Sequence, residues 1–461
     1  MTNTAERIIA AVSTPPGKGG VALIRVSGAG ACTAIEKIFR PRAGKPLSAF
    51  APRTAVYGDV FADGAPLDDA IVTVFPSPHS YTGEETVEIC CHGGILITRR
   101  VLDAVLSVGV RLAEAGEFTR RALLSGRLSL AEAEGIGRLL DAESDAQLRL
   151  SSPTSRTKLT EALGGLHDRL LHLLGDLRAR IDYPEEDLGE MSEGEIAEAL
   201  GSLLADTERL IATYRTGRAV NEGIPTVLCG TPNVGKSSLY NLLAGEELAT
   251  VTAHAGTTRD ILATDLPLGR VMLRIADTAG LRESADPVER IGVARSRERI
   301  AQSELVLAVF DGARPLNADD RALITELHAR GGVTVACINK SDLPEQIERE
   351  ELEGAFSHIL TLSAKNGDGR EKLTALVESL FTDGKIALGE DAVIASARQN
   401  AALISCHRLL AAARDLLAEG HPVDLVSSDL ELALGELGTL TGLSVSEEII
   451  SEIFSRFCVG K

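Results

Sequence analysis

A glycine-rich segment, Gly230 to Ser237, most constrains what this chain can fold into, because it fits the pattern G-x-x-x-x-G-K-S. It follows the apolar run Pro225 to Leu228 and precedes the helical pattern Ser238 to Leu243. Between a strand and a helix, the N–H groups of such a loop surround a phosphate, its lysine neutralises the β and γ oxygens, and its serine ligates Mg²⁺. We therefore predict a nucleotide site with these contacts: Asn233, Val234, Gly235, Lys236, Ser237 and Ser238.

The region around this loop alternates between two periodicities. From Ile224 onward, apolar β-runs at 225–228, 271–275, 305–310 and 333–338 are separated by helical patterns. Such alternation predicts a parallel α/β sheet.

Three more motifs follow strands of this region in order. Asp277-Thr278-Ala279-Gly280 would place a carboxylate near the metal and an N–H near the γ-phosphate. Asn339-Lys340-Ser341-Asp342 offers a carboxylate at Asp342 that can accept the paired N1–H and 2-amino donors of guanine, which adenine does not present. With Ser363-Ala364-Lys365 after the last strand, the order predicts GTP rather than ATP.

The segment Gly256-Thr257-Thr258-Arg259-Asp260 lies where a mobile switch is expected, so Thr258 is the predicted second Mg²⁺ ligand beside Ser237. Leu281 stands where Ras-like proteins carry the glutamine that orients the attacking water, so another group must do this. Glu289 could hold the water, directly or through another water; the alternative is a solvated acid at a helix start.

The flanking regions have different patterns. Residues 1 to about 120 contain short strands broken by Gly and Pro, which indicates a β-rich or α+β domain. Apolar residues from Leu159 to Ile181 then recur every three or four positions, which predicts a helix. Because amphipathic helices must bury their apolar stripes, we expect two helix-rich segments to pack together around an inserted α/β unit. The predicted boundaries are 1–120, 121–222, 223–382 for the α/β unit, and 383–461.

The amino-acid composition argues against a protein that binds nucleic acid on its own. Of 461 residues, Lys and Arg number 47 and Asp and Glu 66, for a net charge of −19, which argues against holding nucleic acid by bulk positive charge. With no Trp, 5 Tyr and 10 Phe, there are few rings for stacking bases, so RNA contact needs a local basic patch or a partner.

The sequence has no secretory signal or long apolar run, and its 7 cysteines lack metal-ligand spacing. We expect a soluble, cytoplasmic protein with reduced thiols and no membrane contact.

The motifs together resemble the TrmE-Era-Era-like GTPases, and the flanks narrow the resemblance to the MnmE (TrmE) family of tRNA modification GTPases over the whole chain. The flanking motifs that carry it are Thr14-Pro15-Pro16-Gly17, Tyr81-Thr82-Gly83-Glu84-Glu85, His92-Gly93-Gly94, Gly116-Glu117-Phe118-Thr119, Asp182-Tyr183-Pro184-Glu185-Glu186-Asp187 and Cys458-Val459-Gly460-Lys461.

The resemblance implies a multidomain α/β and α+β fold. Its parts are an N-terminal β-rich folate-binding and dimerisation domain, a discontinuous helical domain, and an inserted Ras-like P-loop GTPase domain. It also implies a homodimer that works with the FAD-dependent partner MnmG (GidA) in a heterotetramer or larger, with the FAD on the partner. In that complex, the family adds an aminomethyl or carboxymethylaminomethyl group at C5 of the tRNA wobble uridine. A tetrahydrofolate derivative, 5-formyl or 5,10-methylene, supplies the one-carbon unit, and tRNA binds mainly through the complex.

By the same resemblance, hydrolysis of GTP to GDP requires K⁺ and Glu289 positions the water. Asn233 offers its side-chain oxygen to K⁺, and Lys236 neutralises the phosphate oxygens. Ala253 and His254 depart from the family pattern. The side-chain change at residue 254 is compatible with K⁺ binding if this residue offers its backbone carbonyl to the ion. The implied K⁺ ligands are Asn233, Thr252, His254 and Thr257. The implied GTP contacts in this loop are Thr252, Ala253, His254, Ala255, Gly256, Thr257 and Thr258.

For folate, the positions carried over are Arg25, Glu84, Arg127 and Lys461, each of which would otherwise be interpreted as a surface charge. A pterin shows the same paired N–H face as guanine, which a carboxylate can read, while cations suit the folate carboxylates. Arg127 stands where a lysine is familiar, and Cys458 is expected in the pocket without covalent catalysis.

Two other functions remain open from the sequence. One is a regulatory or ribosome-assembly GTPase without one-carbon chemistry, which an RNA-binding KH domain with a basic surface would favour; the C-terminal segment instead looks helical. The other is a folate-dependent enzyme whose GTPase domain is merely regulatory.

Overall fold

The computed structural model describes residues 8–182, 192–245, 263–276, 299–443, 447–455, 457, 459 and 460. The chain divides into two compact units, which we describe one at a time. The first comprises residues 1–140, 163–171 and 434–461, and the second comprises 141–162 and 172–433.

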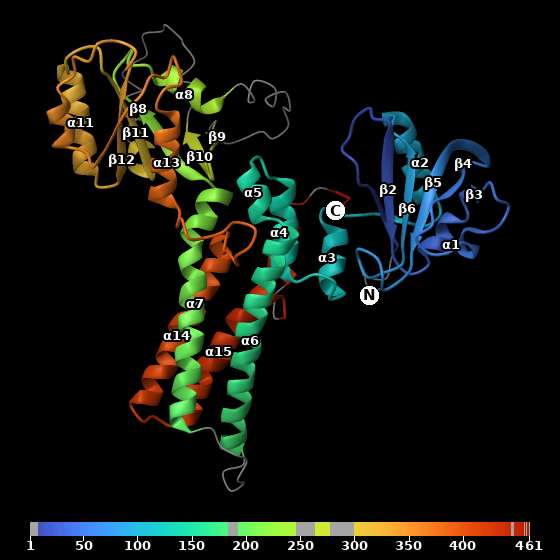
Figure 1. The fold of residues 1–461 in the computed structure, drawn as a ribbon. Coiled ribbons are helices and arrows are strands. Elements are labelled where there is room, and N and C mark those ends of the chain that lie inside the picture. The colour runs from blue at the N-terminus through green and yellow to red at the C-terminus, as the bar shows by residue number, and fades with distance from the viewer. Residues whose placement is uncertain are drawn as a thin grey trace. The chain divides into compact units, whose positions relative to one another are not determined.

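A seven-stranded sheet forms the centre of the first unit, in the order β3-β4-β5-β6-β2-β1-β7 (Figure 1). Neighbouring strands are antiparallel except β1 and β7, which are parallel. In β2, Ala22, Ile24 and Val26 are buried at alternate positions, as expected for a strand with one face on the core. The elements are β1 (Ile9–Val12), β2 (Val21–Ser27), α1 (Ala31–Ile35), β3 (Phe39–Pro41), η2 (Leu47–Ala49), β4 (Val56–Ala62), β5 (Ala65–Phe75), β6 (Thr86–His92), α2 (Ile95–Ser107), β7 (Arg111–Leu112), α3 (Glu117–Leu124) and α4 (Leu130–Leu140).

The C-terminal end of the chain returns to this first unit. Helix α16 (Glu447–Ser455) packs against α3, with Phe454 buried. Val459 forms an isolated antiparallel bridge with Ala115, and Ser13 Oγ donates a 3.0 Å hydrogen bond to the Gly460 carbonyl. Residues Val459 and Gly460 therefore lie beside Ala115 and the end of β1.

A six-stranded sheet forms the centre of the α/β part of the second unit, in the order β13-β12-β11-β8-β10-β9. Five of its strands are parallel, as the sequence predicted. Strand β9, which was not among the predicted runs, pairs antiparallel with β10 through a tight turn at Gly269 and Arg270. The elements are β8 (Ile224–Cys229), α8 (Lys236–Ala244), β9 (Ala263–Leu268), β10 (Val271–Ala276), β11 (Leu305–Asp311), α11 (Ala318–Arg330), β12 (Val333–Asn339), α12 (Arg349–Glu353), β13 (His358–Thr361) and α13 (Arg370–Phe381).

Long helices on both sides of this α/β segment pack together, as the insertion argument requires. Helix α7 (Glu193–Asn221) precedes the sheet and lies against α14 (Ala397–Ala418), which follows it (Figure 1). A 2.9 Å hydrogen bond joins Thr207 Oγ1 to His407 Nδ1 across this helix pair. The other helices are α5 (Asp145–Leu150), α6 (Pro153–Asp182) and α15 (Val423–Thr441).

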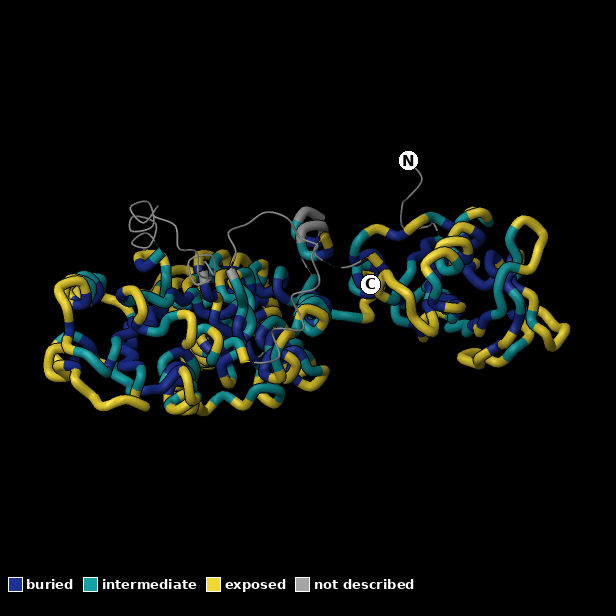
Figure 2. The backbone as a smooth tube through the Cα atoms, turned by 90° about the horizontal axis from the view of Figure 1, so that it is seen from above, coloured by how far each residue is buried: buried dark blue, intermediate teal, exposed yellow. Residues whose placement is uncertain are grey.

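The central strands of the six-stranded sheet are buried. Residues Leu305 to Phe310 of β11 are all buried, and β12 is buried at all but its first residue. Figure 2 shows such buried segments enclosed by intermediate and exposed ones. None of the described helices is long and apolar enough to cross a membrane.

Candidate functional site

The loop between β8 and α8 has the backbone that its glycines predict. Gly235 has φ +102°, and a Cβ there would overlap Asn339 Nδ2. Gly230 has φ +149°, and a Cβ there would overlap the Val309 carbonyl. Asn233, with φ +63°, adopts the left-handed conformation that asparagine tolerates better than most residues. The loop is therefore in close contact with the ends of β11 and β12.

Lys236, the first residue of α8, points back into this loop. Its Nζ donates hydrogen bonds of 2.9 Å to the carbonyls of Gly230 and Thr231. Burial lowers the pKa of Lys236, because removal from water disfavours the charged ammonium. Carbonyls are neutral acceptors, so an anion in the loop would bind this ammonium more strongly than they do.

Asn339 joins three of the predicted motifs. Its Nδ2 donates a 2.8 Å hydrogen bond to the Val234 carbonyl, and its Oδ1 accepts one of 2.9 Å from the Ala364 N–H. The side chain is buried, so both bonds replace contacts with water. The phosphate loop, the Asn339–Asp342 motif and the Ser363–Lys365 motif thus form one connected surface.

The guanine-reading residue predicted from the sequence, Asp342, is held from one side. Ser363 Oγ donates a 2.7 Å hydrogen bond to Asp342 Oδ1, and this bond keeps the pKa of Asp342 below its usual value. The neighbouring Lys340, at φ +67°, extends its Nζ to within 2.6 Å of Asp311 Oδ2. An ionised Asp342 therefore stands ready to accept N–H donors.

These motifs all follow the carboxyl ends of parallel strands, namely β8, β12 and β13. This edge is where open α/β sheets bind ligands. Sequence reasoning missed a charged group at the same edge. It comprises Asp311, Arg314 and Asp320, and its one local signal was the capping box of Asn317 and Asp320 at the start of α11.

Other predicted residues lie outside the described part of the chain. Strand β10 ends at Ala276, immediately before the predicted motif that begins at Asp277. Of the implied K⁺ ligands, only Asn233 is described. The predicted residues outside the described ranges are Thr252, Ala253, His254, Ala255, Gly256, Thr257, Thr258, Asp277, Thr278, Ala279, Gly280, Glu289, Cys458 and Lys461.

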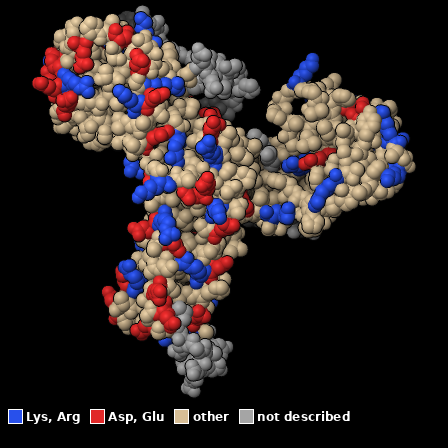
Figure 3. Space-filling view, viewed as in Figure 1, with Lys and Arg blue, Asp and Glu red and all other residues tan. Residues whose placement is uncertain are grey.

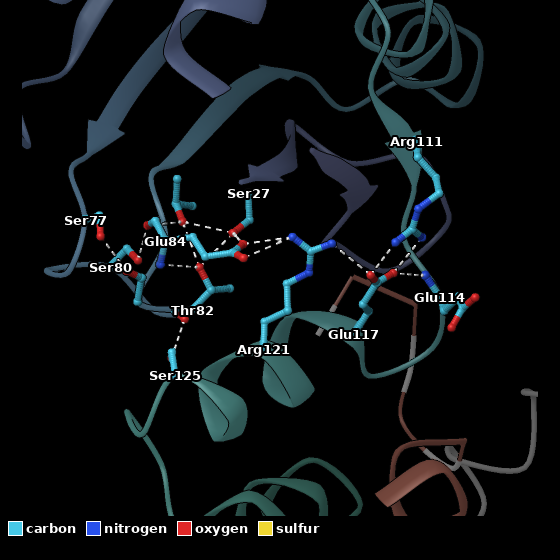
Figure 4. Close-up of polar contacts among 12 residues, drawn as sticks. Ser27, Ser77, Ser80, Thr82, Glu84, Arg111, Glu114, Glu117, Arg121 and Ser125 are labelled. Atoms are coloured by element: carbon cyan, nitrogen blue, oxygen red, sulfur yellow. Dashed lines mark hydrogen bonds and ion pairs between the residues drawn. The ribbon is translucent and has the colours of Figure 1, made fainter. Parts of the chain in front are cut away.

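A second cluster surrounds Glu84 in the first unit (Figure 4). Arg121 Nη1 donates to both oxygens of Glu84, at 2.9 and 3.2 Å, and Ser27 Oγ donates to Oε2 at 2.8 Å. Arg121 also binds Glu117 at 3.1 Å, and Glu117 in turn binds Arg111. The sequence analysis missed Arg121, although its spacing of four residues from Glu117 on a helix was a signal for an ion pair.

The other described folate candidates lie around the same loop. Arg25 has its guanidinium carbon 5.2 Å from the centre of the Tyr81 ring, and its Nε donates to Glu88 at 2.9 Å. Arg127 passes beside Gly83, where an added Cβ would lie 3.1 Å from Arg127 Cγ. The structure thus brings Arg25, Glu84 and Arg127 together around residues 81–85.

One further group has ligand chemistry in the described part of the chain: Asp68, Asp69 and His92. Both oxygens of Asp68 already accept hydrogen bonds from His92, from its backbone N–H at 3.0 Å and its Nδ1 at 2.7 Å. The Asp68 bond raises the pKa of His92. These contacts describe a histidine–carboxylate pair on the sheet.

Comparison with known proteins decides the family. The model of the MnmE helical domain matches residues 130–458, on both sides of the six-stranded sheet, and that of the GTP-binding protein TrmE N-terminus matches residues 8–127. A tRNA modification GTPase MnmE from Symbiobacterium thermophilum is 43% identical over 99% of this chain and 100% of its own length. A relative of the same name from Carboxydothermus hydrogenoformans is 39% identical over the same shares. The chain belongs to the MnmE family.

Two solved structures match about a third of the chain each. A probable GTP-binding protein engB is 21% identical with a TM-score of 0.25, over 34% of this chain and 97% of its own. The G domain of the FeoB iron transporter from T. maritima is 23% identical with a TM-score of 0.25, over 33% of this chain and 96% of its own.

Proposed function

We propose that this member of the MnmE family hydrolyses GTP to GDP and phosphate and uses that cycle in the modification of the tRNA wobble uridine. The observation that carries the proposal is the contact of Asn339 with both Val234 and Ala364, because it connects a phosphate loop to a guanine-reading surface. Family membership supports the tRNA part of the proposal.

For the GTP site, we assign Lys236 to the phosphates and Asp342 to the base. Ser237 and Thr258 would hold Mg²⁺, which neutralises phosphate charge when bound. Asn233 with the switch residues Thr252, His254 and Thr257 would hold K⁺, and Glu289 would hold the attacking water. The cation would act where an arginine is absent from the motifs, at the developing negative charge.

For folate, we assign Glu84 to the pterin, although hydrogen bonds within the protein already use part of its capacity to accept. Ser27 and Arg121 occupy Oε2, whereas Oε1 accepts one longer bond from Arg121 and retains a lone pair. One pterin N–H can therefore bind Oε1 directly, and the second must replace a present donor on Oε2. The cations Arg25, Arg127 and Lys461 would serve the carboxylates of the tetrahydrofolate, which when bound supplies the one-carbon unit.

For partners, we propose a homodimer acting with the FAD-dependent protein MnmG in a cytoplasmic complex that carries the tRNA. On the face shown in Figure 3, Lys and Arg alternate with Asp and Glu along the long helices. Such mixed charge and the net charge of −19 favour tRNA binding mainly through the complex.

Mass spectrometry of wobble nucleosides tests the proposal. In cells that lack this chain, we expect the aminomethyl and carboxymethylaminomethyl modifications at C5 to disappear and the full-length chain to restore them. The Asp342→Asn variant should restore them poorly. Unchanged nucleosides in the deletion strain, with GTP hydrolysis intact in the purified protein, would instead favour a regulatory GTPase.

A further inference from the structure

Behind the phosphate loop lies a closed group of three polar side chains. Thr231 Oγ1 donates a 2.7 Å hydrogen bond to Asp320 Oδ1. Arg314 donates through Nη1 to Asp320 Oδ2 at 2.6 Å and through Nη2 to Thr231 Oγ1 at 3.1 Å. Asp320 is only 1% exposed and Thr231 only 9%, so water replaces little of this bonding. The second residue of the phosphate loop is thus bound to the start of α11.

The same group extends to the guanine-reading motif. Arg314 Nε lies 4.0 Å from Asp311 Oδ2, and this carboxylate oxygen also accepts the 2.6 Å bond from Lys340 Nζ. Contacts therefore run from Thr231 through Asp320, Arg314 and Asp311 to Lys340, two residues before Asp342. They connect the two halves of the nucleotide site by side chains, in addition to the direct bond of Asn339.

The charge on Asp320 holds the hydrogen-bonded side chains of Thr231 and Arg314 in place. Burial would raise the pKa of Asp320, but hydrogen bonds from Arg314, the Asn317 backbone and Thr231 outweigh it and hold the pKa below its ordinary value. A buried carboxylate that loses a donor is costly, so its partners are held in place. Thr231 is one of them, and its carbonyl is an acceptor of Lys236 Nζ.

We propose that Arg314 and Asp320 are positioning residues that couple the phosphate loop to the guanine-reading motif. They fix the Thr231 end of the loop, and Arg314 shares Asp311 with Lys340 at the base end. This inference rests on the proposed GTP binding. It assigns nucleotide retention to residues that contact neither phosphate nor base.

Dissociation of a fluorescent GDP, followed by stopped flow in the full-length chain, tests the loop end. Thr231→Val removes only the hydroxyl and should speed release by about tenfold, because the buried Asp320 carboxylate then loses one of its hydrogen-bond donors. Thr231→Ser restores the hydroxyl and should release GDP at nearly the parent rate. Thr334→Val is the matched control, because Thr334 is buried and its Oγ1 has no partner among the described residues.

A double-mutant cycle tests the coupling. Asp311→Asn breaks the pair with Lys340. In the double variant with Thr231→Val, the acceleration of GDP release should fall short of the product of the two single accelerations by about threefold or more. Thr325→Val is the control on α11, because Thr325 is exposed and its hydroxyl donates to the Arg321 carbonyl one turn earlier on the same helix. Its effect should simply multiply with that of Thr231→Val.

The outcomes separate the two proposals. A parent chain that binds no GDP overturns the proposed function. The coupling is overturned if the parent binds GDP but Thr231→Val releases it as slowly as Thr334→Val does. It is also overturned if the effects of Thr231→Val and Asp311→Asn on the release rate simply multiply. Arg314→Lys keeps the charge but not the two-pronged contact, so it should release GDP at an intermediate rate if Thr231→Val fails to fold.

Discussion

Asn339 Nδ2 lies 2.8 Å from the Val234 carbonyl, at the position that a side chain on Gly235 would occupy. The glycine is therefore needed for two reasons, its φ of +102° and the amide beside it. Alanine at Gly235 must displace Asn339 and so disturb both the phosphate loop and the contact with Ala364. We expect Gly235→Ala to weaken GDP binding by about ten- to a hundredfold, as overpacking costs about 1–3 kcal/mol.

Gly331→Ala is the control for this prediction. Gly331 also has positive φ, +67°, at the end of α11, but an added Cβ there has open space. Equilibrium titration with fluorescent GDP should show near-parent affinity for Gly331→Ala. Equal affinities for both alanine variants would contradict the role of the Asn339 contact.

Asp342 gives a prediction on base selection. Asp342→Asn replaces an acceptor by a group that also donates, so guanine loses a charge-assisted pair while xanthine gains a complement. We expect GTP affinity to fall by about ten- to a hundredfold and xanthosine triphosphate to compete measurably. Ser363→Ala should weaken GTP less, since it removes only the bond that holds Asp342 Oδ1. Competition assays that find unchanged GTP preference in Asp342→Asn would remove this assignment.

Glu117 gives a prediction on pH. Burial alone would raise its pKa, but bonds from Arg111, the Glu114 N–H and Arg121 outweigh burial and lower it. A carboxyl whose folded pKa lies below its unfolded value stabilises the fold above that unfolded value, about 4.3, and loses this effect as pH falls through the folded value. Melting temperatures measured below about pH 5 should fall more steeply in the parent than in Glu117→Gln.

Glu114→Gln is the matched control, because Glu114 is exposed and its backbone N–H is unchanged. It should keep the parent slope. A Glu117→Gln variant with the parent slope would show that the Arg111–Glu117–Arg121 pairs do not set acid stability.

Much of the nucleotide site could be predicted because each motif is local. The loop from Gly230 to Ser237 and the motif at Asn339 depend on neighbours in sequence, and their strands have strong apolar patterns. Pairs such as Thr231 with Asp320 and Glu84 with Arg121 depend on packing across 89 and 37 residues, so no local pattern contained them. Strand β9 was missed because its own sequence contains Thr264, Asp265 and Pro267, so it lacks a clear apolar run.

Glu84 and Arg121 give a prediction on folate. Glu84→Ala should abolish calorimetric binding of 5-formyltetrahydrofolate, since it removes the only acceptor assigned to the pterin. Arg121→Lys keeps one charge but cannot reach Glu84 and Glu117 with two fixed prongs, so binding should weaken by about tenfold. Arg42→Lys, at an exposed pair with Asp59 on the same sheet, is the control. Undiminished folate binding by Glu84→Ala would sink the assignment.

Hydrolysis should require both K⁺ and Glu289. Leu281 cannot orient a water, and the motifs supply no arginine where negative charge develops, so both functions fall to other groups. Rates should be higher in KCl than in NaCl at equal ionic strength, because the smaller Na⁺ fits a K⁺ shell poorly. Asn233→Gly removes the amide oxygen while keeping φ +63° accessible, and should abolish the difference between the salts.

Glu289→Ala should bind GTP nearly normally yet hydrolyse it about a hundredfold more slowly. Single-turnover assays in both salts check these outcomes: equal rates would show that Ala253 and His254 have removed the ion site, and an active Glu289→Ala would assign the water to another residue.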